Sequence, residues 1–345
     1  MTERKLVTIR TISELKPIPK ADTIECAKVD GWKVVVKKGE FQVGDKCVFI
    51  EIDSVVPDTS PFKFLIDKQG KTFYNGKFGA RVKTIRLRGQ LSQGLALPIN
   101  SFHLVDLGGD ITANLDIWKY DPPPPAELAG KVAGNWPSWL QKTDQERIQN
   151  IDPSELTGTY AVEEKMDGTS MSVWIDEHGV LGVGTKSMSL KIDDAVNDGN
   201  TYVRMAHDSG MLKWLSTHVL PQDAPFAIQG ELCGPGVQGN PYKLDRAAFF
   251  AFDIFAPRKG GKLPEGERDN IIEAMQLDGV RIDTVPFICY CDLDEITGNK
   301  IEFLLAEADD KSLVSDVSRE GIVLKDVADG NKSFKCISNK YLENQ

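Results

Sequence analysis

The sequence predicts an α+β protein, in which a small amino-terminal β-barrel precedes a larger domain built on antiparallel sheets with flanking helices. Residues 1–120 alternate polar and apolar side chains, with glycine-containing turns between the runs. Four consecutive prolines occupy positions 122–125, and after them strand-like runs alternate with helix-like ones. We therefore divide the chain into residues 1–120, a proline-rich linker at 121–140, and residues 141–345.

The amino-terminal segment shows short strands separated by Gly and Asp-Gly turns, a pattern typical of a small barrel. The strands are expected within "KVDGWKVVVKKGE", "FQVGDKCVFIEID" and "GARVKTIRLRGQLSQGLALP". We expect Trp32 and Phe41 to be core residues rather than stacking platforms. The stretch "SELKPIPKADTIECAKVDGW" resembles the opening of the oligonucleotide-binding (OB) barrels attached to some tRNA-binding proteins. That resemblance implies an OB-fold nucleic-acid-binding domain over residues 1–120.

A basic run in this segment is a candidate nucleic-acid contact. Arg86 and Arg88 are two residues apart, so strand alternation would place them on one face, suited to a phosphate backbone. A charged edge strand that prevents aggregation explains the same residues equally well. The run contains Arg81, Lys83, Arg86 and Arg88.

The net charge of −10 hides an asymmetry between the two parts of the chain. Residues 1–120 hold 19 Lys and Arg against 14 Asp and Glu, which gives +5. The remainder holds 22 against 37, which gives −15. A basic module joined to an acidic one suits a part that holds a polyanion beside a part that handles metal ions.

Cysteine, histidine and hydropathy patterns exclude several classes of protein. The six cysteines and four histidines show no zinc-finger or HExxH spacing, so zinc chemistry is not expected. No run of about 18 apolar residues or secretory signal is visible, so we expect no membrane partner and a cytoplasmic or otherwise intracellular location.

Beyond the prolines, "WLQKTDQERIQN" is predicted to start a helix capped by Thr143 or Asp144, since an acid follows three residues later. Strand-like runs then alternate with helix-like ones, as expected for mixed α+β architecture. The helix-like runs are "VNDGNTYVRMAHDSGMLKWLSTHVL", "RDNIIEAMQL" and "KIEFLLAEADDKSL".

Several short motifs follow one another in a particular order. Lys165 opens a KxDG element, which taken alone fits a surface lysine beside an Asp-Gly turn. Each later element, taken alone, also has a purely structural interpretation. Glu231 could cap a turn, Phe252 could be a core residue, and the lysines near the carboxyl end could form a solvated face. Together they give an ordered set of chemistry-bearing residues. The elements are "KMDG" with Lys165 and Asp167, "GEL" with Glu231, "FFAFD" with Phe252 and Asp253, "REGIVLK" with Glu320 and Lys325, and "SFKCISNK" with Lys335.

In this order the motifs of residues 160–342 resemble the covalent nucleotidyltransferase superfamily of RNA ligases, DNA ligases and mRNA capping enzymes. With its barrel in front, the whole chain is most similar to RNA ligases of the Naegleria and Deinococcus type. The resemblance implies that Lys165 attacks the α-phosphorus of ATP to form a lysyl-AMP. A lysine ammonium, with an ordinary pKa of about 10.4, must first lose its proton, and we expect nearby cations and a metal ion to favour the neutral amine.

The resemblance also assigns roles to the residues around Lys165. Three acids would hold Mg²⁺ or Mn²⁺, partly through the hydration shell of the ion. Two lysines would contact the α-phosphate. The acids are Asp167, Glu231 and Glu320, and the lysines are Lys325 and Lys335.

Four further residues are expected to bind the nucleotide. Arg147 would orient the leaving pyrophosphate, Phe252 would stack on adenine, and Glu163 could read the adenine edge. Lys186 stands where the family often has an arginine that contacts the ribose or the 5'-phosphate. A second departure is Ile337, at a position where related enzymes often have another lysine. The nearby Lys340 is a weak candidate to replace it.

The function predicted is ATP-dependent RNA ligation of 3'-OH and 5'-phosphate ends. It would proceed through a lysyl-AMP and an adenylylated 5' end, acting as a monomer on a nicked duplex of RNA or of RNA and DNA. A barrel in front of the transferase domain favours RNA over DNA, because DNA ligases and capping enzymes carry theirs afterwards. Two alternatives remain: a capping-type guanylyltransferase, and an RNA-binding protein with an inactive transferase domain.

Overall fold

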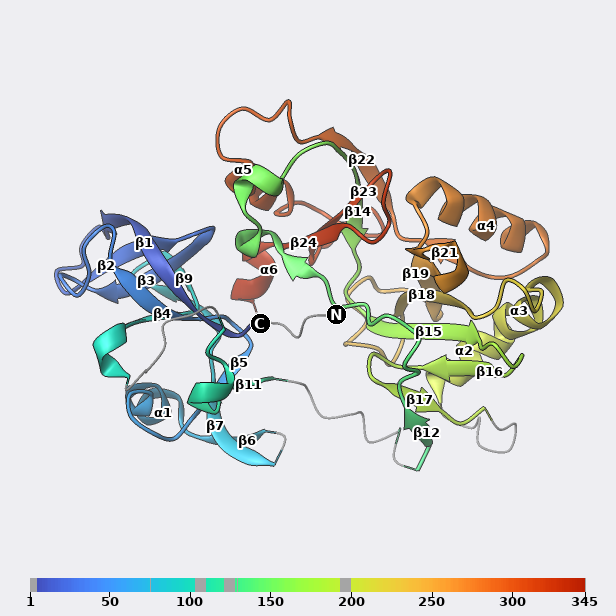
Figure 1. Cartoon of the computed structure of the whole chain (residues 1–345), viewed down its shortest axis with the longest axis horizontal. Helices are drawn as coiled ribbons and strands as arrows, with labels where there is room; N and C mark the ends of the chain where they lie inside the picture. Colours follow the sequence, from blue (N-terminus) through green and yellow to red (C-terminus); the bar gives the residue numbers. More distant parts are fainter. Residues whose placement is uncertain are drawn as a thin grey trace. The chain divides into compact units, whose positions relative to one another are not determined.

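The computed structural model describes residues 5–74, 76–102, 110–120, 128, 130–192 and 200–344. The chain forms two compact units, Met1–Pro124 and Pro125–Gln345, which are described separately (Figure 1). The prolines at 122–125, expected to form a stiff linker, lie outside the described residues. None of the helices in the described part of the chain is long and apolar enough to cross a membrane.

The first unit is built on a five-stranded antiparallel sheet with strand order β10-β4-β1-β2-β3. The end strand β3 lies beside β9, where Val35 N donates to Ser92 Oγ at 2.9 Å, so the sheet curls back toward its other end. A four-stranded sheet has order β11-β5-β7-β6. The elements are β1 Val7–Pro17, β2 Ile24–Val29, β3 Trp32–Lys37, β4 Lys46–Ile50, β5 Ser54–Pro57, α1 Lys63–Gln69, β6 Thr72–Tyr74, β7 Lys77–Arg81, β8 Thr84–Leu87, β9 Gln90–Gln93, β10 Leu95–Pro98 and β11 Trp118–Lys119.

Strand alternation builds the core of this unit. In β3, Trp32, Val34 and Val36 are buried while the residues between them are more exposed. Trp32 is fully buried and Phe41 is 5% exposed, which confirms that both are core residues.

The prediction that Arg86 and Arg88 share one face of a strand is wrong. Strand β8 ends at Leu87, and Arg88 (φ 52°) and Gly89 (φ 82°) form the two-residue turn between β8 and β9. Positive φ at both turn residues is typical of a type I′ hairpin, whose twist matches that of the flanking strands. Both arginines are exposed, and Arg86 Nη1 donates to the carbonyl oxygen of Gly89 at 2.6 Å.

The second unit contains two larger sheets. The eight-stranded sheet has order β12-β17-β16-β15-β18-β19-β20, with β21 paired to β19. The five-stranded sheet has order β13-β24-β23-β14-β22. The strands are β12 Val132–Asn135, β13 Glu146–Arg147, β14 Thr159–Lys165, β15 Thr169–Ile175, β16 Leu181–Gly184, β17 Met188–Leu190, β18 Phe226–Cys233, β19 Ala248–Ala256, β20 Gly261–Lys262, β21 Asp283–Thr284, β22 Phe287–Asp292, β23 Gly321–Asp326 and β24 Ser333–Ile337.

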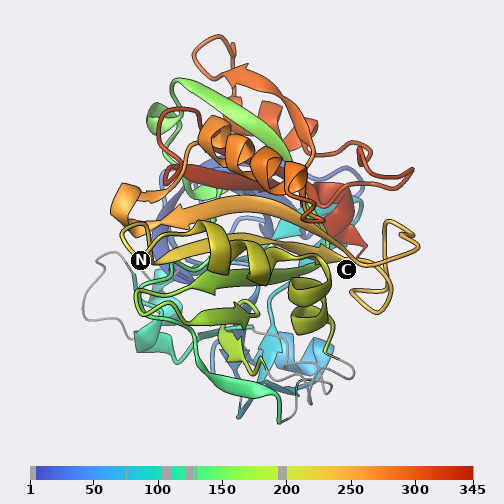
Figure 2. The ribbon, with the colours of Figure 1, turned by 90° about the vertical axis from the view of Figure 1, so that its right-hand side faces the viewer.

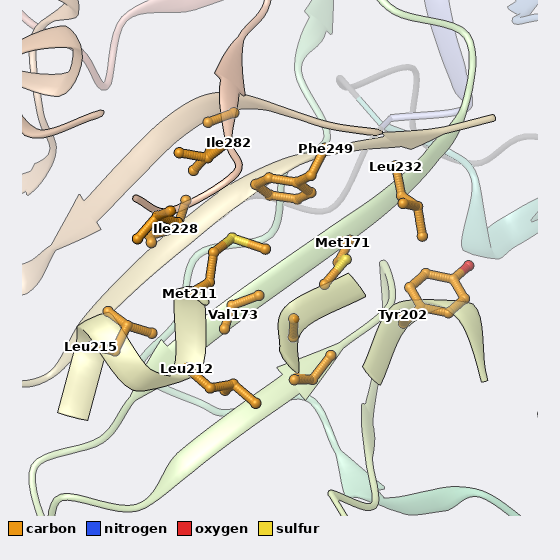
Figure 3. Packing of buried hydrophobic residues seen from close by; sticks show 14 of the residues in the cluster. Met171, Val173, Tyr202, Met211, Leu212, Leu215, Ile228, Leu232, Phe249 and Ile282 are labelled. Atoms are coloured by element: carbon orange, nitrogen blue, oxygen red, sulfur yellow. The ribbon is translucent and has the colours of Figure 1, made fainter. Parts of the chain in front are cut away.

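Helices cover one face of each sheet. On the eight-stranded sheet they are α2 (Thr201–Asp208), α3 (Met211–His218) and α4 (Glu265–Leu277), which share a core with the strands (Figures 2 and 3). On the five-stranded sheet, α5 (Lys300–Glu307) packs against a second core, and the short α6 (Asn339–Glu343) follows β24. The α+β prediction is confirmed, and each of the three helix-like runs contributes to at least one of these helices. The first core includes Met171, Val173, Tyr202, Met211, Leu215, Ile228 and Phe249, and the second includes Tyr160, Val162, Ile301, Leu304, Ile322, Leu324 and Phe334.

The helix expected to start at Thr143 or Asp144 does not form. Strand β13 and a short 3-10 turn at Ile148–Asn150 take its place. Asp144, instead of capping a helix, accepts a hydrogen bond from Lys335 Nζ at 2.7 Å. The helix is therefore replaced by two tertiary contacts: the ion pair of Asp144 with Lys335 on β24, and the pairing of β13 with that strand.

Candidate active site

The polar residues of the site lie on the face of the five-stranded sheet opposite its α5 core. In β14, Tyr160 and Val162 enter that core, so Glu163 and Lys165 point the other way. The same alternation directs Lys325 away from Leu324 on β23, and Lys335 away from Phe334 on β24. Strand pairing thus gathers lysines that are far apart in the sequence.

Lys165 and Glu320 form the central contact of the site. Lys165 Nζ donates to Glu320 Oε2 at 2.7 Å. The contact arises because Lys165 pairs with Gly321 across β14 and β23, which brings the preceding Glu320 alongside. No other residue fits at position 321, because the Cβ of a side chain there would lie 2.1 Å from the carbonyl oxygen of Cys336.

Three carboxylates surround the Lys165 amine and keep it protonated. Burial lowers the pKa of Lys165, but Glu320, Glu231 and Asp167 together outweigh burial and raise it above its ordinary value. The protein groups around Lys165 therefore favour the ammonium, whereas the expectation of a neutral amine counted on a metal ion as well as on nearby cations. Because these acids outweigh the effect of burial, neutralising the amine needs additional positive charge.

Burial also raises the pKa values of two of these carboxyl groups. Burial raises the pKa of Glu231 to about 8, although the Lys165 ammonium opposes this, and burial together with Glu320 raises the pKa of Asp167. Among the described residues, no three His, Cys, Asp or Glu side chains are placed to hold a metal ion directly. A set of three nearby carboxylates without a tight cage fits a hydrated Mg²⁺ or Mn²⁺, which keeps much of its water shell.

The KMDG turn is held in place by close packing against β18. A Cβ on Gly168 would lie 2.4 Å from the carbonyl oxygen of Leu232 and 2.6 Å from Cys233 Sγ. Asp167 N donates to Tyr242 Oη at 2.6 Å, and the Tyr341 hydroxyl hydrogen-bonds the Asp167 side chain. The glycine of this element is therefore needed for the approach that brings Glu231 toward Lys165.

A second cationic group lies on β13 and β24. Lys335 donates to Asp144 Oδ1 at 2.7 Å, and Arg147 is its register partner on the neighbouring strand. Burial lowers the pKa of Lys335 to about 8, Asp144 opposes the shift, and the positive charges of Arg147 and Lys165 add to it. Arg147 is only 6% exposed. A buried arginine and a partly buried lysine, the latter near Lys165, suit the binding of phosphate oxygens.

A buried ion network lies beside this group. Lys325 Nζ is 3.0 Å from Glu163 Oε2 and 2.9 Å from Asp253 Oδ1, and it also donates to the carbonyl oxygen of Phe252. Lys262 Nζ lies 2.6 Å from Asp253 Oδ2. Burial alone would raise the pKa of Asp253, but Lys262 and Lys325 outweigh it and lower the pKa to about 2. Lys325 and Glu163 are therefore engaged with protein groups and almost fully buried.

The remaining candidate residues are placed as follows. Phe252 is half-buried on β19, with its ring centroid 5.9 Å from Lys325 Nζ, and packs near Met166 and Tyr242. Lys186 is exposed in the turn between β16 and β17, and no contact within the described residues joins it to the groups around Lys165. Lys340 Nζ donates to the carbonyl oxygen of Asp309 at 3.0 Å.

Sequence reasoning missed several contributors to this site. Arg268 on α4 lies 2.5 Å from Glu163 Oε1, although its helix shows no functional motif. Asp144 fits a helix cap in the sequence, and Lys262 and Tyr242 carry no recognisable spacing. The only sign of them in the sequence is that charged residues are frequent near the motifs. The sequence does not show which of these charged residues form ion pairs with one another.

Comparison with known proteins gives the following matches. A family model described as an OB-fold domain matches residues 6–99, and one described as RNA ligase matches residues 158–337. The chain is similar to Naegleria gruberi RNA ligase in several solved structures. A ligand-free mutant shares 38% identity with a TM-score of 0.89, and a mutant with ATP and Mn shares 38% with a TM-score of 0.88. The enzyme with pyrophosphate shares 37% with a TM-score of 0.88. In each case 99% of both chains is covered. No curated protein matches this chain. The two family matches occur in the predicted order, with the OB-fold first.

Proposed function

This chain belongs to the RNA ligase family, and from that membership we propose that it uses ATP to join a 3'-OH end to a 5'-phosphate end in nicked duplexes that contain RNA. The observation that carries the proposal is the Lys165 amine, which lies near three carboxylates and near Lys335, the register partner of Arg147. This arrangement provides a nucleophile, acids suited to a metal, and cations suited to phosphates.

The first step would form a covalent adenylate on Lys165. The lone pair of the neutral amine attacks the α-phosphorus of ATP, a P–N bond forms, and the P–O bond to the pyrophosphate breaks. The nitrogen loses its proton, and pyrophosphate leaves with the electron pair. The AMP is then transferred to a 5'-phosphate, and a 3'-hydroxyl displaces it to form the phosphodiester bond. Glu320, the direct partner of the amine, is positioned to accept or hold that proton.

Asp167, Glu231 and Glu320 would hold a hydrated Mg²⁺ or Mn²⁺ near Lys165. When bound, the ion supplies positive charge that favours the neutral amine and offsets charge on the phosphate oxygens. The carboxylates orient its water shell, and Gly168 keeps Glu231 close enough to take part. Structures of Naegleria gruberi RNA ligase contain Mn with ATP or AMP, which supports the use of a divalent ion here.

The cations of β13 and β24 would bind the phosphates. We assign Lys335 to the α-phosphate and Arg147 to the leaving pyrophosphate, with Asp144 as the protein partner that Lys335 exchanges for phosphate. Phe252 would stack on adenine. A direct contact of Lys325 with the α-phosphate, or of the Glu163 side chain with adenine, would require these groups to leave their ion pairs. Lys186, exposed on its turn, would reach the nucleotide only through movement of that turn.

The amino-terminal unit would contribute RNA binding. We propose residues 1–120 as the OB-fold domain, 121–140 as the linker and 141–345 as the adenylation domain of a monomeric enzyme. The exposed Arg86 and Arg88 at the β8–β9 hairpin would contact phosphates of the duplex. The excess of positive charge in this part of the chain, set against the acidic remainder, supports the assignment.

A sealing assay tests the substrate. Nicked duplexes with every combination of RNA and DNA at the two ends are incubated with the full chain, ATP and Mg²⁺. We expect sealing when the 3'-OH strand is RNA, and its loss when that strand is DNA would support the assignment. Sealing of none of the substrates would contradict it.

Incubation with labelled ATP and labelled GTP distinguishes the proposed ligation from capping chemistry, because a capping enzyme would form a lysyl-GMP. RNA binding without incorporation of either label would indicate an inactive transferase domain.

A further inference from the structure

A buried arginine outside all the motif segments joins the two sheets of the second unit. Arg268 lies in the first turns of α4 and is 2% exposed. Its Nη1 lies 2.5 Å from Glu163 Oε1 on β14, in the five-stranded sheet. The same nitrogen donates to the carbonyl oxygen of Phe252 on β19, in the eight-stranded sheet, at 2.9 Å. One guanidinium therefore links an acid of one sheet to the backbone of the other.

Lys325 also connects Glu163 with the Phe252 carbonyl. Its Nζ lies 3.0 Å from Glu163 Oε2 and donates to the Phe252 carbonyl. Each oxygen of Glu163 thus faces one cation, and the Phe252 carbonyl accepts from both. Such a doubly anchored carbonyl leaves the backbone at Phe252 little freedom to shift.

The charges of this network balance. Three cations face three carboxylates, and five of the six groups are nearly fully buried. Removal of one member would leave a buried charge without its partner, which is a strong constraint on its position. The cations are Lys262, Arg268 and Lys325, and the carboxylates are Glu163, Asp253 and Asp269.

We propose that Arg268 is a positioning residue for adenine recognition, which holds the Phe252 carbonyl against Glu163 and so fixes the ring on which the base stacks. The inference rests on the proposed function, in which Phe252 stacks on adenine. Arg268 acts through Phe252 and does not touch the nucleotide, because its guanidinium is buried and engaged with Glu163, Asp269 and the Phe252 carbonyl. A misplaced ring weakens ATP binding more than it slows the transfer of AMP, provided Lys165 and the phosphate-binding cations stay in place.

The test compares variants of the full chain in steady-state adenylation with ATP and Mg²⁺. Arg268→Met removes the contacts with Glu163, Asp269 and the Phe252 carbonyl, and we expect the KM for ATP to rise by about tenfold while kcat changes by less than about threefold. Arg268→Lys keeps the positive charge, but on a single nitrogen in place of the planar guanidinium, and should recover part of the loss. Glu273→Gln is the control, because it removes an exposed acidic charge from the same helix, outside the network, and should keep the KM of the unmodified protein.

A double-mutant cycle distinguishes positioning from a purely structural role. If Arg268 acts by positioning the Phe252 ring, Phe252→Leu already removes that ring. Adding Arg268→Met to Phe252→Leu should therefore raise the KM for ATP no further. Multiplicative effects of the two changes would overturn the proposal, as would a folded Arg268→Met variant with unchanged KM and only reduced thermal stability. If Arg268→Met does not fold, the cycle is made with Arg268→Lys, and the same outcomes decide. Absence of any adenylate on the unmodified protein would instead contradict the proposed function.

Discussion

Lys165 Nζ and Glu320 Oε2 lie 2.7 Å apart, although 155 residues separate them in the chain. The nucleophile proposed for adenylation is therefore stored as an ammonium in an ion pair, within reach of Glu231 and Asp167. An amine in this state cannot attack phosphorus until its proton leaves. In the proposed mechanism, activation requires positive charge from a bound metal ion, because the protein groups around Lys165 favour the ammonium.

Weakening this ion pair should make Lys165 more reactive toward simple amine reagents. Glu320→Gln removes a negative charge that raises the pKa of Lys165, so the pKa falls and the neutral fraction at a given pH increases. We expect acetic anhydride to label Lys165 at lower pH in this variant than in the unmodified protein, as followed by mass spectrometry without ATP. The exposed Lys186 provides the internal control and should label identically in both. An unchanged or upward-shifted labelling profile would contradict the account.

Lys335 should limit adenylation at alkaline pH. Its pKa is lowered to about 8, chiefly by burial and by the nearby charge of Arg147, so the folded protein loses this cation as pH rises through that value. The rate of adenylation should therefore decline above about pH 8 if Lys335 acts as a charged phosphate ligand. Lys335→Arg keeps its charge and should extend activity to higher pH, even if its maximal rate is lower. A decline at the same pH in both proteins would assign the alkaline limb to another group.

The glycine of the KMDG turn should tolerate no side chain. In Gly168→Ala the new Cβ would meet the Leu232 carbonyl and Cys233 Sγ, so β18 or the turn must shift. We expect a loss of roughly 1–3 kcal/mol in the free energy of unfolding and a severe loss of adenylation. Urea denaturation and adenylate formation measure the two effects.

Gly266 offers the control for that change. It lies in α4, its φ is not positive, and beyond its own helix no heavy atom lies within 4 Å of the position that a Cβ would occupy. Gly266→Ala should leave adenylation unchanged and raise stability by up to about 1 kcal/mol, because alanine favours helix. Equal behaviour of the two alanine variants would show that close packing at Gly168 is not required.

Removing a hairpin arginine should separate adenylation from sealing. Arg86→Ala changes the amino-terminal unit alone, so Lys165 should accept AMP as before while sealing of a nicked duplex weakens. If one phosphate contact is lost, the dependence of log affinity on log salt should become shallower by about 0.7–0.9. Lys213→Ala, an exposed change on α3, serves as the control and should alter neither property. Normal sealing by Arg86→Ala would remove this arginine from the RNA-binding surface.

The order of the motifs makes much of the site predictable. Strand alternation and strand pairing bring the key residues to one face of the sheet: Lys165, Glu320 and Lys335. The order of their motifs along the chain already predicts that they belong to one site. Arg268 is not predictable, since a single arginine in an amphipathic helix carries no sign that it is buried against Glu163. Its role depends on how α4 packs, which is a property of tertiary structure.

Local signals fail where a tertiary contact or a turn takes precedence. Asp144 fits a helix cap in the sequence, yet its carboxylate binds Lys335. Arg88 follows strand alternation in the sequence, yet it occupies a hairpin turn with φ 52° because Gly89 follows it. The raised pKa of Lys165 could not be predicted, because the acids that surround it come from three separate segments of the chain.

Mass spectrometry of the purified full chain, mixed with ATP and Mg²⁺ and then digested, tests the central claim most directly. The account predicts an AMP adduct on the peptide that contains Lys165, and no adduct anywhere in Lys165→Ala. An adduct that persists in Lys165→Ala, or an unmodified Lys165 in protein that seals RNA, would contradict it.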